Sequence, residues 1–126
     1  MSVAVLLIAH GSRRRAANDD LVQLADLIRG AGRYEIVEVS YLELAEPTIP
    51  QGGRRCVEAG AHKVLMMPYF LSAGMHVVED LEEHRRNLAA EFPQTQFLLC
   101  PPLGLHPLMT DVVLARLSEG EHAAAE

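Results

Sequence analysis

The sequence predicts an α/β domain in which a four-stranded parallel sheet is flanked by helices. Strand-like apolar segments alternate four times with segments of helical spacing along the 126 residues. The first apolar run, VAVLLIA at 3–9, is continuous, as in a strand covered on both faces. Because parallel neighbours need long, right-handed crossovers, the alternation favours a single domain similar to half of a flavodoxin-like or Rossmann-like fold.

The first half of the chain contains two strand–helix pairs. After the strand at 3–9, apolar residues recur at helical spacing within 15–30, and glycines follow as a stop signal. Residues 34–41 alternate apolar side chains with glutamates, which is typical of a strand with one more exposed face. A second helix is predicted within residues 46–61. Its Gly52–Gly53 pair opposes that helix, since glycine costs about 1 kcal/mol relative to alanine.

The second half repeats the pattern, with strands predicted at 62–70 and 95–102 and helices at 77–92 and 106–119. A chain of this length can bury one core without disulfides or structural metals. The predicted domain therefore spans residues 1–119. The remaining segment, GEHAAAE at 120–126, is expected to be a frayed tail.

Composition argues against several classes of function. A formal net charge of −6 argues against non-specific binding to nucleic acid or to an anionic membrane, since both need a broad basic face. The N-terminus has no basic region or small-residue cleavage site, and no apolar run has the length that spans a bilayer. Cys56 and Cys100 lie outside any CxxC motif, so no disulfide framework or thiolate metal site is indicated. We therefore expect a cytoplasmic protein.

Metal-capable side chains follow three of the predicted strands. His10 comes directly after the first strand, and Glu43 and His76 come shortly after the second and third. Ligands bind beyond the carboxyl ends of parallel strands, so these side chains are expected to converge. Imidazole and carboxylate are ligands of first-row divalent metals such as iron, cobalt, nickel and zinc. His106 and Asp80 are further candidates, Asp80 as an acceptor that orients an imidazole; the alternative for each histidine is an ordinary loop hydrogen bond.

A local anion-binding site is predicted directly after the first strand. Gly11 and Ser12 can expose backbone amides at the start of the next helix, where the partial positive charge favours anions. The three arginines at 13–15 add full positive charges. The alternative is a solvated helix start in which these arginines pair with Asp19 and Asp20.

The segments around these residues are AHGSRRRAAND at 9–19, YLELAEPTI at 41–49, PYFLSAGMHVVEDL at 68–81 and LGLHPLM at 103–109. Together they resemble the signature regions of the small CbiX-type sirohydrochlorin chelatases, which are related to the SirB and CbiK enzymes. The resemblance covers almost the whole chain in the same order, with one domain where longer relatives have two. It implies insertion of a divalent metal, cobalt or iron and in some members nickel, into sirohydrochlorin during cobalamin, sirohaem or nickel-tetrapyrrole biosynthesis.

The resemblance also implies residue roles. The family's two active-site histidines fall on His10 and His76, and its metal-binding glutamate falls on Glu43. These three residues are expected to hold the incoming metal and to take up pyrrole protons as the catalytic residues. The metal ion is a substrate, and no organic cofactor is expected.

The same resemblance implies how the tetrapyrrole is held. Sirohydrochlorin carries many carboxylates around a flat apolar ring, so basic residues are expected to bind the carboxylates while apolar residues after the third strand face the ring. The expected substrate-binding residues are Ser12, Arg13, Arg14, Tyr69, Phe70, Leu71, Ser72 and Met75. Short family members form homodimers, which rebuild the cleft of the two-domain relatives, so a homodimer is expected.

Two other functions remain open at this point. A carrier of metal or tetrapyrrole without turnover would share the fold and the ligands. A histidine phosphatase is the second alternative, because HGSR after a strand is superficially similar to an RHG motif. In that motif an arginine precedes the histidine directly, whereas Ala9 precedes His10 here.

Overall fold

Four parallel strands form the centre of the structure, a computed structural model that describes residues 2–125. The strands are β1 (Ser2–Ala9), β2 (Ile36–Tyr41), β3 (Ala61–Pro68) and β4 (Gln96–Leu99), arranged in the order β2-β1-β3-β4. β1 pairs with both β2 and β3, and Ile8 near its end is in register with Ser40 and Pro68. The carboxyl ends of three strands therefore meet at one edge, and the predicted α/β fold with a parallel sheet is confirmed.

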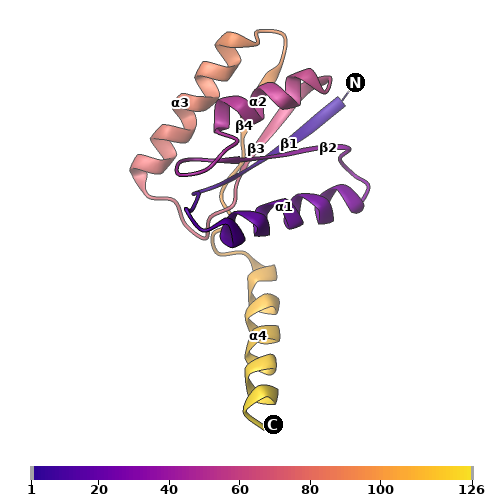
Figure 1. Cartoon of the computed structure of the whole chain (residues 1–126), viewed down its shortest axis with the longest axis vertical. Helices are drawn as coiled ribbons and strands as arrows, with labels where there is room; N and C mark the ends of the chain where they lie inside the picture. Colours follow the sequence, from indigo (N-terminus) through magenta and orange to yellow (C-terminus); the bar gives the residue numbers. More distant parts are fainter. Residues whose placement is uncertain (1, 126) are drawn as a thin grey trace.

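Helices cover the two faces of the sheet unequally (Figure 1). α1 (Arg15–Gly30) packs on one face against β1 and β2, whereas α2 (Ile49–Glu58) and α3 (Met75–Glu91) share the opposite face. α4 (Pro107–Ala125) extends away from the rest of the chain. The helix continues beyond residue 119, so the segment that the sequence pattern predicted as a frayed tail is helical as far as Ala125.

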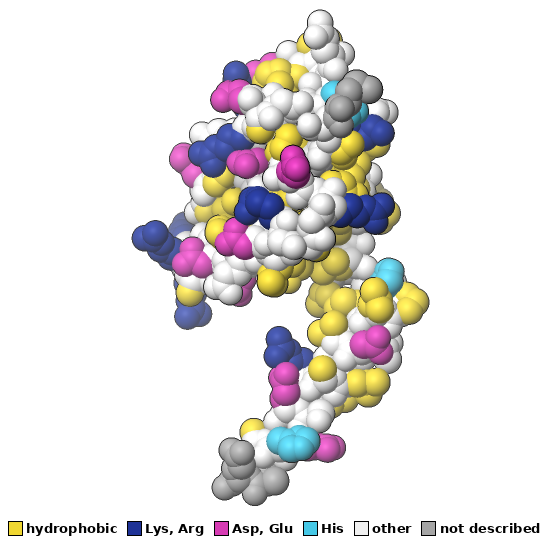
Figure 2. Space-filling model, turned by 90° about the vertical axis from the view of Figure 1, so that its right-hand side faces the viewer, with side chains coloured by type: hydrophobic (Ala, Val, Ile, Leu, Met, Phe, Trp, Pro, Cys, Tyr) yellow, Lys and Arg dark blue, Asp and Glu magenta, His cyan; other side chains and the backbone are white. Residues whose placement is uncertain are grey.

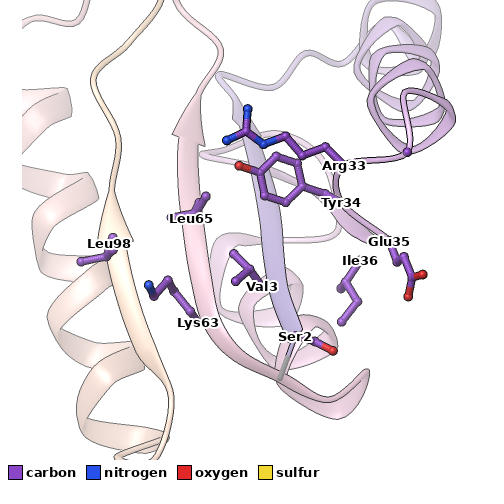
Figure 3. A pocket seen from close by; sticks show the side chains of 10 residues that line it. Ser2, Val3, Arg33, Tyr34, Glu35, Ile36, Lys63, Leu65 and Leu98 are labelled. Atoms are coloured by element: carbon purple, nitrogen blue, oxygen red, sulfur yellow. The ribbon is translucent and has the colours of Figure 1, made fainter.

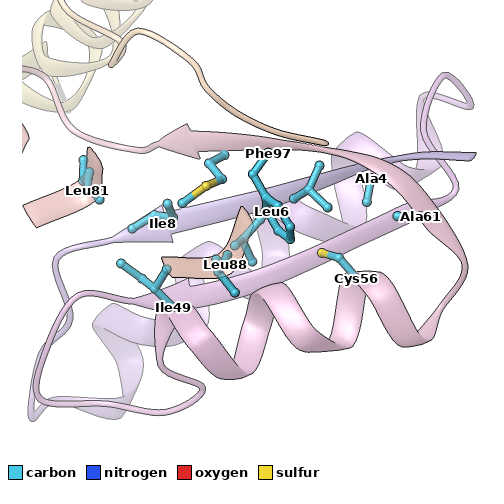
Figure 4. Packing of buried hydrophobic residues seen from close by; sticks show 11 residues of the cluster. Ala4, Leu6, Ile8, Ile49, Cys56, Ala61, Leu81, Leu88 and Phe97 are labelled. Carbon is cyan, nitrogen blue, oxygen red and sulfur yellow. The ribbon is translucent and has the colours of Figure 1, made fainter. Parts of the chain in front are cut away.

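Two hydrophobic clusters hold the layers together. Between the sheet and α2 and α3, Leu6, Cys56 and Leu88 are fully or almost fully buried (Figure 4). Between the sheet and α1, the cluster includes Leu7 and Leu21. Burial raises the pKa of the Cys56 thiol to about 12, so this thiol stays protonated and unreactive at neutral pH. Within residues 2–125, no helix has the length and apolar character needed to cross a membrane.

The Gly52–Gly53 pair in α2 is explained by packing. A Cβ atom at Gly52 would lie 2.7 Å from Leu6 Cδ1, and one at Gly53 would lie 2.7 Å from Leu88 Cδ2. α2 therefore packs closely on the sheet and α3 because these positions have no side chain. A capping box offsets part of the low helix propensity, since Thr48 and Gln51 exchange side-chain to backbone hydrogen bonds at the start of α2.

β3 and β4 end earlier than the sequence pattern predicted, at Pro68 and Leu99. Prolines coincide with both ends, because β3 ends on Pro68 and β4 is followed by Pro101 and Pro102, and proline has no amide hydrogen with which to continue a strand ladder. The residues after these strands are therefore loops at the carboxyl edge of the sheet.

Candidate metal-binding site

His10 and Glu43 lie side by side at the carboxyl edge of the sheet. His10 Nε2 is 3.0 Å from Glu43 Oε1, and the two side chains are 57% and 58% exposed. The pairing of β1 with β2 continues past both strands, since Leu42 N donates to Ala9 O at 2.9 Å and Glu43 N donates to His10 O at 3.0 Å. This continuation of the ladder brings together two residues that the sequence predicted as metal ligands.

The geometry of this pair suits a shared metal ion. Two donor atoms bound to one octahedral ion at about 2.1 Å and at a right angle lie about 3.0 Å apart. The separation of His10 Nε2 and Glu43 Oε1 has this value. The two atoms share a hydrogen bond, so a cation bound between them would replace the shared proton. Because both groups are exposed, a hydrated ion can reach them directly.

Gly11 determines how closely the two loops approach. Its φ of +100° lies in the left-handed region, and a Cβ atom built on it would lie only 1.7 Å from Glu43 O. Any side chain at this position would therefore push the β2 loop away from His10. The sequence analysis assigned Gly11 an exposed amide and missed this packing role.

Asn18 and Tyr41 hold the loop that follows His10. Ser12 N donates to Asn18 Oδ1 at 3.0 Å, Asn18 Nδ2 donates to Ser12 O at 2.8 Å, and Tyr41 Oη donates to Asn18 O at 2.7 Å. The prediction that Ser12 exposes its backbone amide to an anion is therefore wrong, because Asn18 occupies it. Burial, and then the charge of Asp19, raise the pKa of Tyr41, which keeps its phenol protonated as a donor. Sequence reasoning missed both Asn18 and Tyr41.

The three arginines beside this loop have exposed side chains. The sequence left open whether they pair with Asp19 and Asp20. Among residues 2–125, none of the three takes part in an ion pair. Arg14 N donates to Ser12 Oγ at 3.0 Å, which orders the backbone but leaves the guanidinium groups accessible. Positive charge is thus available next to the His10–Glu43 pair.

The loop after β3 borders the pair on its other side. Tyr69 N donates to Ile8 O at 2.7 Å, which attaches this loop to the end of β1. The Phe70 ring contacts the His10 ring edge to face, with centroids 6.1 Å apart and an angle of 71° between the planes. Phe70 is half-buried and packs against the core, so the His10 ring packs on a side chain that is itself held in place.

An exposed apolar surface continues from this loop. Tyr69, Leu71 and Met75 are 42%, 64% and 76% exposed. Leu44, directly after Glu43, is also exposed and has a positive φ of 65°. Ser72 is exposed within the same loop. Large apolar side chains held in solvent beside a polar pair are typical of a surface that binds an apolar ligand; sequence reasoning did not include Leu44.

The other predicted ligands do not join the pair. His76 is the second residue of α3 and has an exposed side chain, but residues 2–125 contain no group of three His, Cys, Asp or Glu side chains arranged to hold a metal ion. Asp80 makes no hydrogen bond to a histidine within the same residues. His106 Nδ1 accepts a hydrogen bond from Leu108 N at 3.1 Å, so its ring caps the start of α4.

Comparisons with known proteins show which family this chain resembles as a whole. The CbiX family profile matches residues 4–120. The chloroplastic sirohydrochlorin ferrochelatase of Arabidopsis thaliana is 37% identical over 90% of this chain and 50% of its own length. The sirohydrochlorin chelatase SirB of Bacillus subtilis subspecies spizizenii, solved in complex with cobalt, has a TM-score of 0.86 and 28% identity over 94% of this chain and 51% of SirB.

A cobalamin biosynthesis CbiX protein of Marinobacter aquaeolei has a TM-score of 0.82 and 26% identity, and the match covers 96% of this chain and 98% of that protein. The chain thus spans about half the length of the Arabidopsis relative and of SirB, and almost all of the Marinobacter protein.

Proposed function

The chain belongs to the CbiX family, and we propose that it inserts a divalent metal ion into sirohydrochlorin. The observation that carries this proposal is the exposed His10–Glu43 pair, whose donor atoms are 3.0 Å apart at the carboxyl edge of the sheet. Iron and cobalt are the metals named for similar proteins, in a ferrochelatase and in the cobalt complex of SirB. The ligand chemistry of this pair supports the proposed activity.

Metal capture is the first step that the pair can perform. A neutral imidazole and a carboxylate bind a first-row divalent ion and leave its other positions to water. Exchange of those waters for pyrrole nitrogens then moves the ion from the protein to the macrocycle. The single formal charge of Glu43 keeps the complex weak enough for release, since a cage of several carboxylates would retain the ion.

Proton removal is the second step. Insertion of a divalent ion releases two pyrrole N–H protons from the macrocycle for each ion inserted. Once the ion has left, His10 and Glu43 are free bases at hydrogen-bonding distance from each other, so each can accept one proton and pass it to solvent. The exposure of both side chains provides the route to water.

The surroundings of the pair suit a flat, polyanionic substrate. The arginines at 13–15, which form no ion pair among the described residues 2–125, can attract the carboxylates of the tetrapyrrole, and Arg13 and Arg14 lie closest in sequence to His10. Tyr69, Leu71 and Met75 offer an exposed apolar surface to the ring. We assign Ser72, the hydroxyl of Ser12 and the exposed part of Phe70 to the same substrate-binding surface; the backbone amide of Ser12 is not included, because it is bonded to Asn18.

We assign His76 as a third ligand that joins when the substrate is bound. It lies at the start of α3, after the strand adjacent to β1, and its ring is exposed. A homodimer is part of the same proposal, because the chain has about half the length of SirB and of the Arabidopsis relative. A second copy would supply the other wall of the cleft.

A visible-absorbance assay of sirohydrochlorin with Co²⁺, Fe²⁺ or Ni²⁺ tests the proposal. His10→Ala and Glu43→Gln are expected to lower the insertion rate by about 100-fold, because each removes a ligand and a proton acceptor. The insertion rate of His76→Ala is expected to fall below that of His84→Ala, because His84 lies in the same helix and is assigned no role. Rates for His10→Ala and Glu43→Gln equal to that of the unaltered protein would overturn the proposal.

The number of product molecules per protein separates an enzyme from a carrier. Many metallated tetrapyrroles per protein molecule are expected from a chelatase. A yield that stops at one, with the product still bound, would show a carrier that shares the fold and the ligands.

A further inference from the structure

Most of α4 lacks a packing partner among the described residues of one copy of the chain. Within residues 2–125 it makes no extensive contact with any strand or other helix, and Figure 1 shows it extending away from the sheet. Its apolar side chains are nonetheless numerous, and Figure 2 shows hydrophobic side chains along the projecting helix. A helix that is apolar on most of its sides is normally buried. The exposed apolar residues are Leu108, Val112, Val113, Leu114 and Leu117.

One part of the sheet lacks a covering helix. α1 covers β1 and β2 on its face, but no helix of residues 2–125 covers β3 and β4 on that side. Figure 3 shows Val3, Leu65 and Leu98 projecting from the strands there, around a cavity of about 570 Å³. Leu98 is 38% exposed. A parallel sheet is normally covered on both faces, so this half-face, defined by Val3, Lys63, Leu65 and Leu98, is missing one helix.

The connection before α4 favours a partner in another copy. Leu103 N donates to Phe70 O at 3.0 Å, and His106 caps the start of the helix. Only Gly104 and Leu105 separate the attached Leu103 from the cap of the helix. A return of α4 onto its own half-face would need a reversal within two residues, whereas a second copy can meet the helix where it already points.

We infer that α4 of one protomer covers the half-face of β3 and β4 in a second copy, and that the second copy returns the same contact. The inference specifies the interface of the dimer in the proposed function and does not depend on metal chemistry. The lengths agree, since the 19 residues of α4 span about 28 Å and the 8 residues of β3 span about 26 Å. A reciprocal exchange of this kind closes with twofold symmetry.

Charge supports the same direction of packing. Helices that cover parallel sheets run antiparallel to the strands, so the end of α4 would meet the beginning of β3. Lys63 lies near the beginning of β3, and Arg33 lines the same cavity. Glu121 lies in the last part of α4, whereas Glu119 there is paired with Arg116 at 2.9 Å. The cavity is also lined by Glu35, so the charge match is that of Glu121 with Lys63 and Arg33.

Light scattering on the full chain tests the exchange. The unaltered protein is expected to be a dimer, and Leu117→Glu on α4 or Leu98→Glu on the half-face is expected to give monomers. Leu27→Glu, which alters an exposed leucine on α1, is the control that stays dimeric. An equimolar mixture of Leu117→Glu and Leu98→Glu is expected to recover heterodimers, because one of the two contacts is then intact.

Cross-linking identifies which copy the helix covers. Leu98→Cys and Leu117→Cys are combined with Cys100→Ser, while the buried Cys56 remains. A short bis-maleimide is expected to join two chains. A cross-link within one chain would overturn the inference, because α4 would then cover its own sheet. A dimer that forms no cross-link would overturn the proposed position of α4 but not the proposed homodimer. A protein that is monomeric at all concentrations would contradict both the position of α4 and the homodimer. Neither result decides whether the protein inserts metal, which the insertion assay tests.

Discussion

The loops after β1 and β3 flank the same site but are built differently. The loop after β1 is fixed by contacts, since Gly11 lies against Glu43 O and Asn18 bonds to both polar atoms of the Ser12 backbone. The loop after β3 is attached at Tyr69, but Leu71, Ser72 and Met75 extend into solvent. One side of the site is thus rigid and polar, whereas the other is exposed and mostly apolar.

The difference fits the two tasks of the proposed reaction. Metal ligands must be held at a defined separation, because coordination distances vary little. A large apolar substrate needs surface area, and its binding tolerates side chains that adjust. The β1 loop is therefore expected to be sensitive to small substitutions, and the β3 loop is expected to affect substrate binding more than stability.

Gly11→Ala should have the largest effect. The new Cβ atom would overlap Glu43 O, and alanine disfavours a φ of +100°. Overpacking and the left-handed backbone together are expected to lower the free energy of unfolding by about 3 kcal/mol. Urea denaturation measures this loss of stability. The molecules that remain folded should also insert metal more slowly in the insertion assay. A stable and active variant would show that the two loops are free to separate.

Asn18→Ala should have the next largest effect. It leaves the partly buried Ser12 N without its acceptor, which is expected to cost about 2 kcal/mol. The insertion rate should also fall, because the backbone next to His10 loses its anchor. Asn18→Asp retains the acceptor for Ser12 N and serves as the matched variant. If Asn18→Ala is as stable as the unaltered protein, Asn18 does not hold the loop that follows His10.

Tyr69→Ala is expected to act on the substrate and not on the fold. The side chain is 42% exposed and the backbone bond to Ile8 O is kept. The free energy of unfolding should change by no more than about 0.5 kcal/mol, since the substitution lies at the surface. The KM for sirohydrochlorin should rise by about 10-fold, because a buried ring contributes roughly 1 to 3 kcal/mol to binding. An unchanged KM would place the ring of the tetrapyrrole elsewhere.

Gly74→Ala should have the smallest effect and is the control for Gly11→Ala. Gly74 has an ordinary φ of −68°, and among residues 2–125 no atom outside its immediate chain neighbours lies within 4 Å of the position a Cβ would take. The free energy of unfolding is expected to change by less than about 0.5 kcal/mol, because the lost N-cap preference and the reduced entropy of the unfolded chain offset each other. A large loss here would show that the β3 loop is as constrained as the β1 loop.

Much of the fold and part of the site could be predicted from the sequence. The alternation of strands and helices is a local signal, and it correctly predicted a parallel sheet. The convergence of His10 with Glu43 follows from that topology, because residues after adjacent parallel strands share an edge. The resemblance to the CbiX family is carried by the segments that contain His10 and Glu43 and by the two segments that follow β3 and β4.

Other features depend on tertiary contacts and have no local signature. Helix propensity alone makes Gly52 and Gly53 unfavourable within α2. Only the positions of Leu6 and Leu88 show why a side chain does not fit at either glycine. Asn18 is an ordinary polar residue in the sequence, and its role arises from its distance to Ser12.

The sequence by itself determined the elements of this protein, their order and the chemical types of its candidate ligands, because propensity and periodicity act over a few neighbouring residues. The tertiary structure decided which ligands meet, which amides are already bonded and where α4 points. These properties depend on distances between remote segments, and such distances are set by packing.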